Sequence, residues 1–115
     1  MTEFLSREQM AWRCAHDFED GAYVNLGVGM PLMVVSFLPK DRDVIIHSEN
    51  GILGMESLEE DAEPDWDLVN AGKQPVKMLP GGSFFHHADS VLMVRGGHLD
   101  YCVLGAYEVS RDGDL

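Results

Sequence analysis

The pattern of apolar and polar residues in the first forty positions predicts a helix, a strand and a second helix. Ser6 and Gln9 have the spacing of a capping box, and apolar residues then recur at helical intervals up to a stop at Gly21. Residues 22–26 form a short apolar run that is typical of a strand. Proline suits the first turn of a helix, so the apolar run after Pro31 predicts a buried helix that ends near residue 39.

The later apolar segments predict further strands and one more helix. Residues 44–47 are rich in β-branched side chains, which is typical of a strand buried on both faces of a parallel sheet. A strand over 76–79 should end at the Pro-Gly-Gly of 80–82, and a helix capped by Ser83 should run to Arg95. Residues 99–104 form a last apolar strand. This βαβ order predicts a three-layer α/β/α fold with an open, mostly parallel sheet, in which segments 44–47 and 99–104 are central strands.

The turn Gly27-Val28-Gly29-Met30-Pro31 combines glycines with the expected start of a helix. It lacks the third glycine of a dinucleotide fingerprint and the Gly-Lys-Ser/Thr of a P-loop. Free backbone amides at a helix N-terminus favour an anion site, but a purely structural tight turn fits the same residues. Both readings stay open on the pattern alone.

Glu49 is the most informative polar residue, because it follows a strand and precedes Asn50-Gly51, a pair well suited to a left-handed turn. In a parallel sheet, a carboxylate in this position lies at the edge where α/β folds bind ligands. A glutamate there serves as a general base, a metal ligand or a nucleophile, and a surface acid beside a turn is the alternative.

Composition narrows the function classes. The 115 residues suffice for one domain, and 20 acidic against 8 basic residues give a net charge of −12. This charge argues against nucleic-acid and anionic membrane partners, and no apolar run approaches the roughly 20 residues of a membrane span. Two cysteines and no signal peptide predict a reduced, cytoplasmic protein. The five histidines lack paired ligand spacing, so we predict no metal site.

Several short motifs occur in an order that resembles a known family. They are Gly27-x-Gly29-x-Pro31, Ser48-Glu49-Asn50-Gly51, Pro80-Gly81-Gly82, Arg95-Gly96-Gly97-His98 and Leu104-Gly105-Ala106. Together they resemble the B (beta) subunit of family I 3-oxoacid coenzyme A transferases over nearly the whole chain. The Phe-His-His-Ala-Asp-Ser stretch of residues 85–90 is most similar to the 3-oxoadipate (β-ketoadipate) branch, which serves aromatic degradation.

The resemblance implies that coenzyme A (CoA) moves from succinyl-CoA to a 3-oxo acid through a covalent glutamyl-CoA thioester on Glu49. It implies no tightly bound cofactor, since the CoA thioester is a substrate, and it implies a heteromer with an A-type CoA-transferase subunit. The residues that it assigns to CoA or substrate binding are Gly27, Gly29, Pro31, Asn50, Gly51 and Gly105.

Two departures from the family pattern leave alternatives open. Glu108 stands where family members usually carry glutamine, and such subunits run to about twice this length. Residues 1–115 are therefore predicted to be the N-terminal part of a single B-type domain, inactive in isolation. A transferase for acetoacetate or another short-chain acid and a truncated, non-catalytic fragment are the alternatives.

Overall fold

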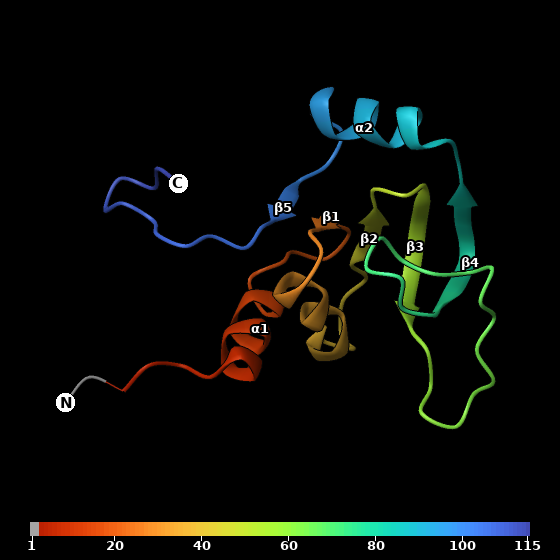
Figure 1. Ribbon diagram of the computed structural model, residues 1–115, viewed down its shortest axis with the longest axis horizontal. Coiled ribbons are helices and arrows are strands. Elements are labelled where there is room, and N and C mark those ends of the chain that lie inside the picture. The colour runs from red at the N-terminus through yellow and green to blue at the C-terminus, as the bar shows by residue number, and fades with distance from the viewer. Residues whose placement is uncertain (1–2) are drawn as a thin grey trace.

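The computed structural model describes residues 3–115 and contains one five-stranded sheet with three helical segments (Figure 1). The elements in chain order are α1 (Arg7–Ala15), β1 (Tyr23–Leu26), the 3-10 helix η1 (Met30–Phe37), β2 (Ile45–Ser48), β3 (Ile52–Ser57), β4 (Val76–Phe84), α2 (His87–Arg95) and β5 (Tyr101–Val103). No helix among residues 3–115 is long and apolar enough to cross a membrane.

The strands lie in the order β4-β3-β2-β1-β5, and the predicted α/β class is confirmed. Strand β1 pairs in parallel with both β2 and β5, as the βαβ pattern predicts. The other two pairings, β2 with β3 and β3 with β4, are antiparallel, so the sheet is mixed rather than mostly parallel. The tight turn at residues 49–51 reverses the chain between β2 and β3 and needs no crossover helix, and the loop between β3 and β4 reverses it again.

Strand positions differ from the expectation in two further ways. Strand β2 is central, but β5 pairs only with β1 and so forms an edge of the sheet within the described residues. Strand β4 does not end at Pro80 but continues to Phe84. Its register against β3 shifts between Leu53 and Met55, and Gly81 has a φ of +85°. The glycines therefore form an irregularity within the strand rather than its end, as in a β-bulge.

The helices follow their local signals, with shorter bounds. The Ser6 hydroxyl accepts a hydrogen bond from the Gln9 amide, and the Gln9 side chain accepts one from the Ser6 amide, which confirms the capping box. Helix α1 ends at Ala15 instead of near residue 20. The segment after Pro31 is a 3-10 helix instead of an α-helix. The N-cap of α2 is His86 rather than Ser83, because its ring nitrogen accepts from the Ala88 amide.

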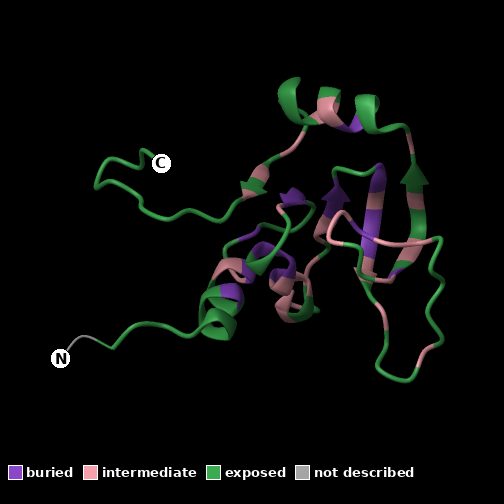
Figure 2. Cartoon of the chain, viewed as in Figure 1, coloured by how far each residue is buried: buried purple, intermediate pink, exposed green. Residues whose placement is uncertain are grey.

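The apolar core lies between the sheet and the pair formed by α1 and η1, which pack against each other. Figure 2 shows the buried residues concentrated in β1, β2, β3 and η1, whereas the long acidic loop after β3 (residues 58–67) and the C-terminal segment are largely exposed. Side chains alternate along strands, so Val24 and Ile46 face this core while Asn25 and His47 occupy the opposite face. Helix α2 reaches His47 on that second face through Ser90, but it lies beyond the carboxyl end of β2 rather than across the sheet, so the predicted third layer is not formed by the described residues.

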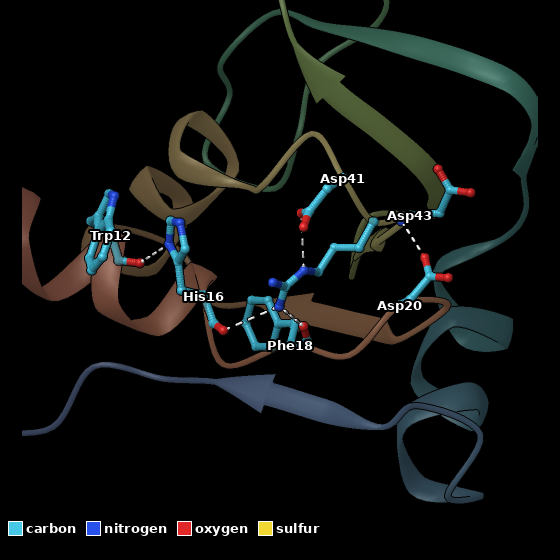
Figure 3. A network of polar contacts seen from close by, with 7 residues as sticks. Trp12, His16, Phe18, Asp20, Asp41 and Asp43 are labelled. Carbon is cyan, nitrogen blue, oxygen red and sulfur yellow. Dashed lines mark hydrogen bonds and ion pairs between the residues drawn. The ribbon is translucent and has the colours of Figure 1, made fainter.

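The amino-terminal ends of β1 and β2 are held together by a cluster around Arg42 (Figure 3). The Arg42 guanidinium donates to the carbonyl oxygens of His16 and Phe18, at 3.3 and 2.8 Å. Nearby, the Asp43 amide donates to the Asp20 carboxylate at 2.6 Å. This cluster lies at the opposite end of these strands from Glu49, which makes Arg42 a suitable control position for experiments on the site.

Candidate functional site

The carboxyl ends of three neighbouring strands meet at one edge of the sheet. Strands β5, β1 and β2 are mutually parallel, so the segments that follow them emerge on the same side. Glu49 follows β2, the turn of Gly27 and Gly29 follows β1, and Gly105 follows β5. The topology therefore gathers the predicted site residues at the edge where α/β sheets bind ligands.

Glu49 occupies the tight turn between β2 and β3, with its side chain exposed and the turn backbone anchored. The Gly51 amide donates to the Ser48 carbonyl at 3.0 Å, which closes the turn. The Glu49 carbonyl accepts a hydrogen bond of 2.7 Å from Nδ1 of His87, on α2. An exposed carboxylate on an anchored backbone is an arrangement suited to a nucleophile that must reach a bound substrate.

A loop that the sequence did not single out, residues 69–74, braces the same turn. The Asn50 side chain donates to the Val69 carbonyl at 2.7 Å, and the Ala71 amide donates to the Ser48 hydroxyl at 3.0 Å. Asn70 holds the loop in shape, because its side-chain oxygen accepts from two amides of the same loop. Asn50 thus supports the turn through its side chain, and its predicted substrate contact stays a prediction.

The glycine turn uses one of its backbone amides within the sheet. The Gly27 amide donates to the Val103 carbonyl at 2.9 Å, because pairing of β1 with β5 extends one residue beyond the strand. That amide is therefore not available to an anion. Gly29 has a φ of +92° and precedes Pro31 at the start of η1. Gly29 also lines a hollow of about 350 Å³ between η1 and β3, and Glu49 is not among the residues lining it.

His47 is fully buried directly before the turn and is bonded through both ring nitrogens. Nδ1 lies 2.9 Å from the side-chain nitrogen of Asn25, and Nε2 lies 2.9 Å from the Ser90 hydroxyl. Burial lowers the pKa of His47 below its ordinary value, and the negative charge of Glu49 offsets part of that effect. His47 is therefore a core histidine whose two ring nitrogens are both hydrogen-bonded.

This burial predicts a pH-dependent stability. Near pH 6 the unfolded chain protonates His47, with a reference pKa of about 6.5, while the folded chain resists protonation. The free energy of unfolding should therefore fall as the pH drops below about 6.5, by up to about 1.4 kcal/mol for each unit that separates the two pKa values. Urea unfolding between about pH 5 and pH 8 measures this for the wild type and His47→Gln. The variant should lose this part of the slope, and identical slopes would contradict the assignment.

The remaining titratable groups at the site give little sign of other chemistry. Among residues 3–115, no three His, Cys, Asp or Glu side chains are grouped so as to hold a metal ion. Both cysteines are free thiols. Partial burial raises the pKa of the Cys102 thiol, which makes it a weaker nucleophile at neutral pH. The side chain is nevertheless exposed in the structure, so Cys102 is not a core residue.

Comparison with known proteins identifies the family. The sequence profile described as "Coenzyme A transferase" matches residues 7–115. The chain belongs to the coenzyme A transferase family. It is 57% identical over 115 residues to the B subunit of 3-oxoadipate CoA-transferase from Pseudomonas putida, covering 100% of this chain and 54% of that protein. The corresponding protein of Acinetobacter baylyi is 54% identical over 96% of this chain and 51% of its own length.

A mitochondrial relative extends the comparison beyond bacteria. The human succinyl-CoA:3-ketoacid coenzyme A transferase 2 is 50% identical over 96% of this chain, which spans 21% of that protein. The chain spans about half the length of the bacterial proteins that it matches. The resemblance inferred from the short motifs is thereby confirmed at the level of the family.

The sequence did not predict the buried polar residues that support the Glu49 turn. Asn25, His47 and Ser90 come from three separate elements, and no local spacing links them. The signal that could have found them is the register of the parallel strands, because it places Asn25 directly beside His47. For the loop after Val69, the sequence Asn70-Ala71-Gly72 is a turn signal that was available and unused.

Proposed function

We propose that this chain is the N-terminal part of a B-type CoA-transferase subunit, in which Glu49 carries CoA as a covalent thioester between succinyl-CoA and 3-oxoadipate. The observation that carries the proposal is the placement of Glu49. Its exposed carboxylate lies at the carboxyl end of a central parallel strand, on a turn anchored by α2 and by the loop after Val69. The identity to the B subunits of two bacterial 3-oxoadipate CoA-transferases supports the substrate class.

The chemistry requires a carboxylate nucleophile, because a thioester is exchanged with an acid. A Glu49 oxygen attacks the succinyl thioester carbon and the C–S bond breaks, which gives a succinyl–glutamyl anhydride and CoA thiolate. The thiolate attacks the Glu49 carbonyl carbon and releases succinate, leaving the glutamyl-CoA thioester. The 3-oxo acid carboxylate attacks that thioester, and the released thiolate attacks the new anhydride to give 3-oxoacyl-CoA and free Glu49. No net proton moves, so no general base is required.

An A-type partner completes the site in this proposal. The chain carries a net charge of −12, whereas CoA is an anion, so the partner must supply much of the phosphate binding. The tetrahedral intermediates need N–H donors, and the Gly27 amide is already used within the sheet. Gly29, Pro31 and Gly105, at the edge that Glu49 shares, remain the proposed CoA and substrate contacts of this chain. The predicted cytoplasmic location stays a prediction.

A second candidate substrate is acetoacetate or another short-chain 3-oxo acid. Two points favour it: the 50% identity to a succinyl-CoA:3-ketoacid transferase, and Glu108, which departs from the motif pattern that the sequence resembles. An added carboxylate near Gly105 disfavours a dianionic acid such as 3-oxoadipate by charge repulsion. Comparison of kcat/KM for 3-oxoadipate and acetoacetate in the assembled enzyme, with Glu108→Gln as the matched variant, separates the two.

Trapping the covalent intermediate tests the function itself. We expect that the assembled enzyme, incubated with succinyl-CoA alone, gains the mass of one CoA on the peptide containing Glu49. Hydroxylamine should release this CoA and leave a hydroxamate at the same residue, since a thioester is readily cleaved by this nucleophile. An assembled enzyme that transfers CoA without such an adduct would refute the covalent route. An assembly with neither adduct nor transfer would support a non-catalytic role.

A further inference from the structure

We propose that a row of hydrogen bonds, Cys102-Asn25-His47-Ser90, which is buried from Asn25 to Ser90, positions the Glu49 turn by fixing helix α2 against the sheet. The four side chains are positioning residues, since none of them reaches the exposed carboxylate. The activity measurements below rest on the proposed function, whereas the NMR measurement of the His47 ring depends on the geometry alone.

Three of the four side chains come from one row of the sheet. In the parallel register, Asn25 of β1 lies directly beside His47 of β2 and directly beside Cys102 of β5. The Cys102 thiol donates to the side-chain oxygen of Asn25 at 3.4 Å. Asn25, His47 and Ser90 are all buried, and among the described residues no buried side-chain nitrogen or oxygen lacks a hydrogen-bond partner. A buried polar row that is fully satisfied specifies one arrangement of the elements it joins.

The donors in this row all point the same way. A thiol beside the Asn25 oxygen leaves the Asn25 NH₂ group facing His47, so Nδ1 of His47 must accept. The Ser90 hydroxyl donates onward to the Ser48 carbonyl at 3.4 Å, so it must accept from Nε2 of His47. Both ends of the row therefore require the same neutral ring, with its proton on Nε2.

The row ends on the peptide groups that flank the Glu49 side chain. Ser90 of α2 contacts the Ser48 carbonyl, and His87, one turn earlier on the same helix, donates to the Glu49 carbonyl at 2.7 Å. Helix α2 thus holds two successive carbonyl groups, one on each side of the Glu49 Cα atom. Figure 1 shows why this is possible: α2 lies beyond the carboxyl end of β2, over the β2–β3 turn. Fixing these two peptide planes fixes the direction in which the carboxylate leaves the backbone.

Breaking the row should therefore lower the rate of the chemical step more than it weakens substrate binding. A displacement of about 1 Å in a nucleophile costs around 100-fold in rate. We expect Ser90→Ala to reduce kcat by about 10- to 100-fold, with KM changed less than about threefold. Formation of the Glu49–CoA adduct from succinyl-CoA, followed in a single turnover, should slow by the same factor.

Two substitutions of His47 separate the two arms of the row. His47→Asn places an amide oxygen where Nδ1 lies and keeps the bond from Asn25, but it cannot reach Ser90. His47→Gln places its amide nitrogen near the Nε2 position and keeps the donor to Ser90. If α2 transmits the effect, Gln should retain kcat within about fivefold of the wild type, and Asn should lose about as much as Ser90→Ala. Equal kcat values for Asn and Gln would overturn the proposal.

Arg42→Ala is the matched control for lost stability. It removes two partly buried hydrogen bonds at the far end of the same strands and should lower the free energy of unfolding without changing kcat. A proportional loss of kcat in Arg42→Ala and Ser90→Ala would show that stability alone governs activity, which would overturn the positioning role. So would a Ser90→Ala enzyme with the kcat of the wild type.

The protonation state of His47 can be measured without any activity. In ¹⁵N-labelled wild-type protein within the assembled enzyme, the His47 ring should give the NMR signature of a neutral Nε2–H tautomer at pH 7. An Nδ1–H tautomer or a charged ring would overturn the row as described, even if every variant failed to fold. If the wild-type assembly had no transfer activity, the proposed function would fail, and the tautomer would still decide the geometry of the row.

Discussion

Replacing Glu49 with glutamine should abolish CoA transfer, by at least about 1,000-fold in kcat, because the amide has the right shape but no nucleophilic oxygen anion. Alanine should have the same effect. Aspartate keeps the charge, but one methylene fewer moves the carboxylate back by about 1 Å, which should cost around 100-fold. Transfer from succinyl-CoA in the assembled enzyme, and mass analysis of the adduct, measure all three.

These losses should occur in correctly folded proteins. The Glu49 side chain is exposed, and the hydrogen bond from His87 goes to its backbone carbonyl, which every substitution retains. We therefore expect the free energy of unfolding of each variant to stay within about 0.5 kcal/mol of the wild type. Glu60→Gln changes an exposed acid in the acidic loop, beyond β3 from the Glu49 turn, so it removes the same charge and should leave transfer unchanged.

A fully active Glu49→Gln enzyme would end the covalent mechanism. Slow recovery of activity during long incubation would be a different result, because deamidation of the glutamine would regenerate Glu49. Mass analysis distinguishes the two, since the recovered fraction would carry a residue about one mass unit heavier. Activity proportional to that fraction would support Glu49 as the nucleophile.

The local signals of the sequence were sufficient where one short segment decides the structure. Three features are each determined by a few neighbouring residues. They are the capping box at Ser6, the β-branched run in β2 and the Gly96-Gly97 end of α2. The end of α2 follows the expected glycine pattern, since Gly97 has a φ of +74° and the His98 amide donates to the Met93 carbonyl. The position of Glu49 after a central strand was likewise predicted from the residues directly before and after it.

Features that depend on pairing between distant segments could not be read in the same way. The Pro-Gly-Gly of β4 looks like a strand end, but pairing with β3 on both sides of it carries the strand through. Likewise, Asn25 and Ser90 look like ordinary polar residues until the register and α2 bring them to His47. Tertiary contacts override local propensity at all of these positions. Two of them, Asn25 and Ser90, also support the Glu49 turn through His47.

Gly51→Ala should be severely destabilising, because the turn leaves no room for a side chain. Gly51 has a φ of +112°, and a Cβ atom there would overlap the carbonyl oxygen of Phe85. That oxygen belongs to the backbone leading into α2, where the Phe85 amide donates to the Gly51 carbonyl at 3.0 Å. The overlap can be relieved only by separating the turn from α2.

The expected cost combines backbone strain with overpacking, at about 1–3 kcal/mol each, so we expect the free energy of unfolding to fall by about 3 kcal/mol or more. Gly21→Ala is the matched control, since its φ is +81° and nothing lies within 4 Å of the added Cβ. In Gly21→Ala the free energy of unfolding should fall only by the cost of backbone strain, about 1–2 kcal/mol. Urea unfolding measures the free energy of unfolding of both variants. Equal decreases would show that a Cβ atom at position 51 does not clash with the Phe85 carbonyl oxygen. A larger loss in Gly51→Ala would mean that this glycine lets α2 approach closely enough to hold Glu49.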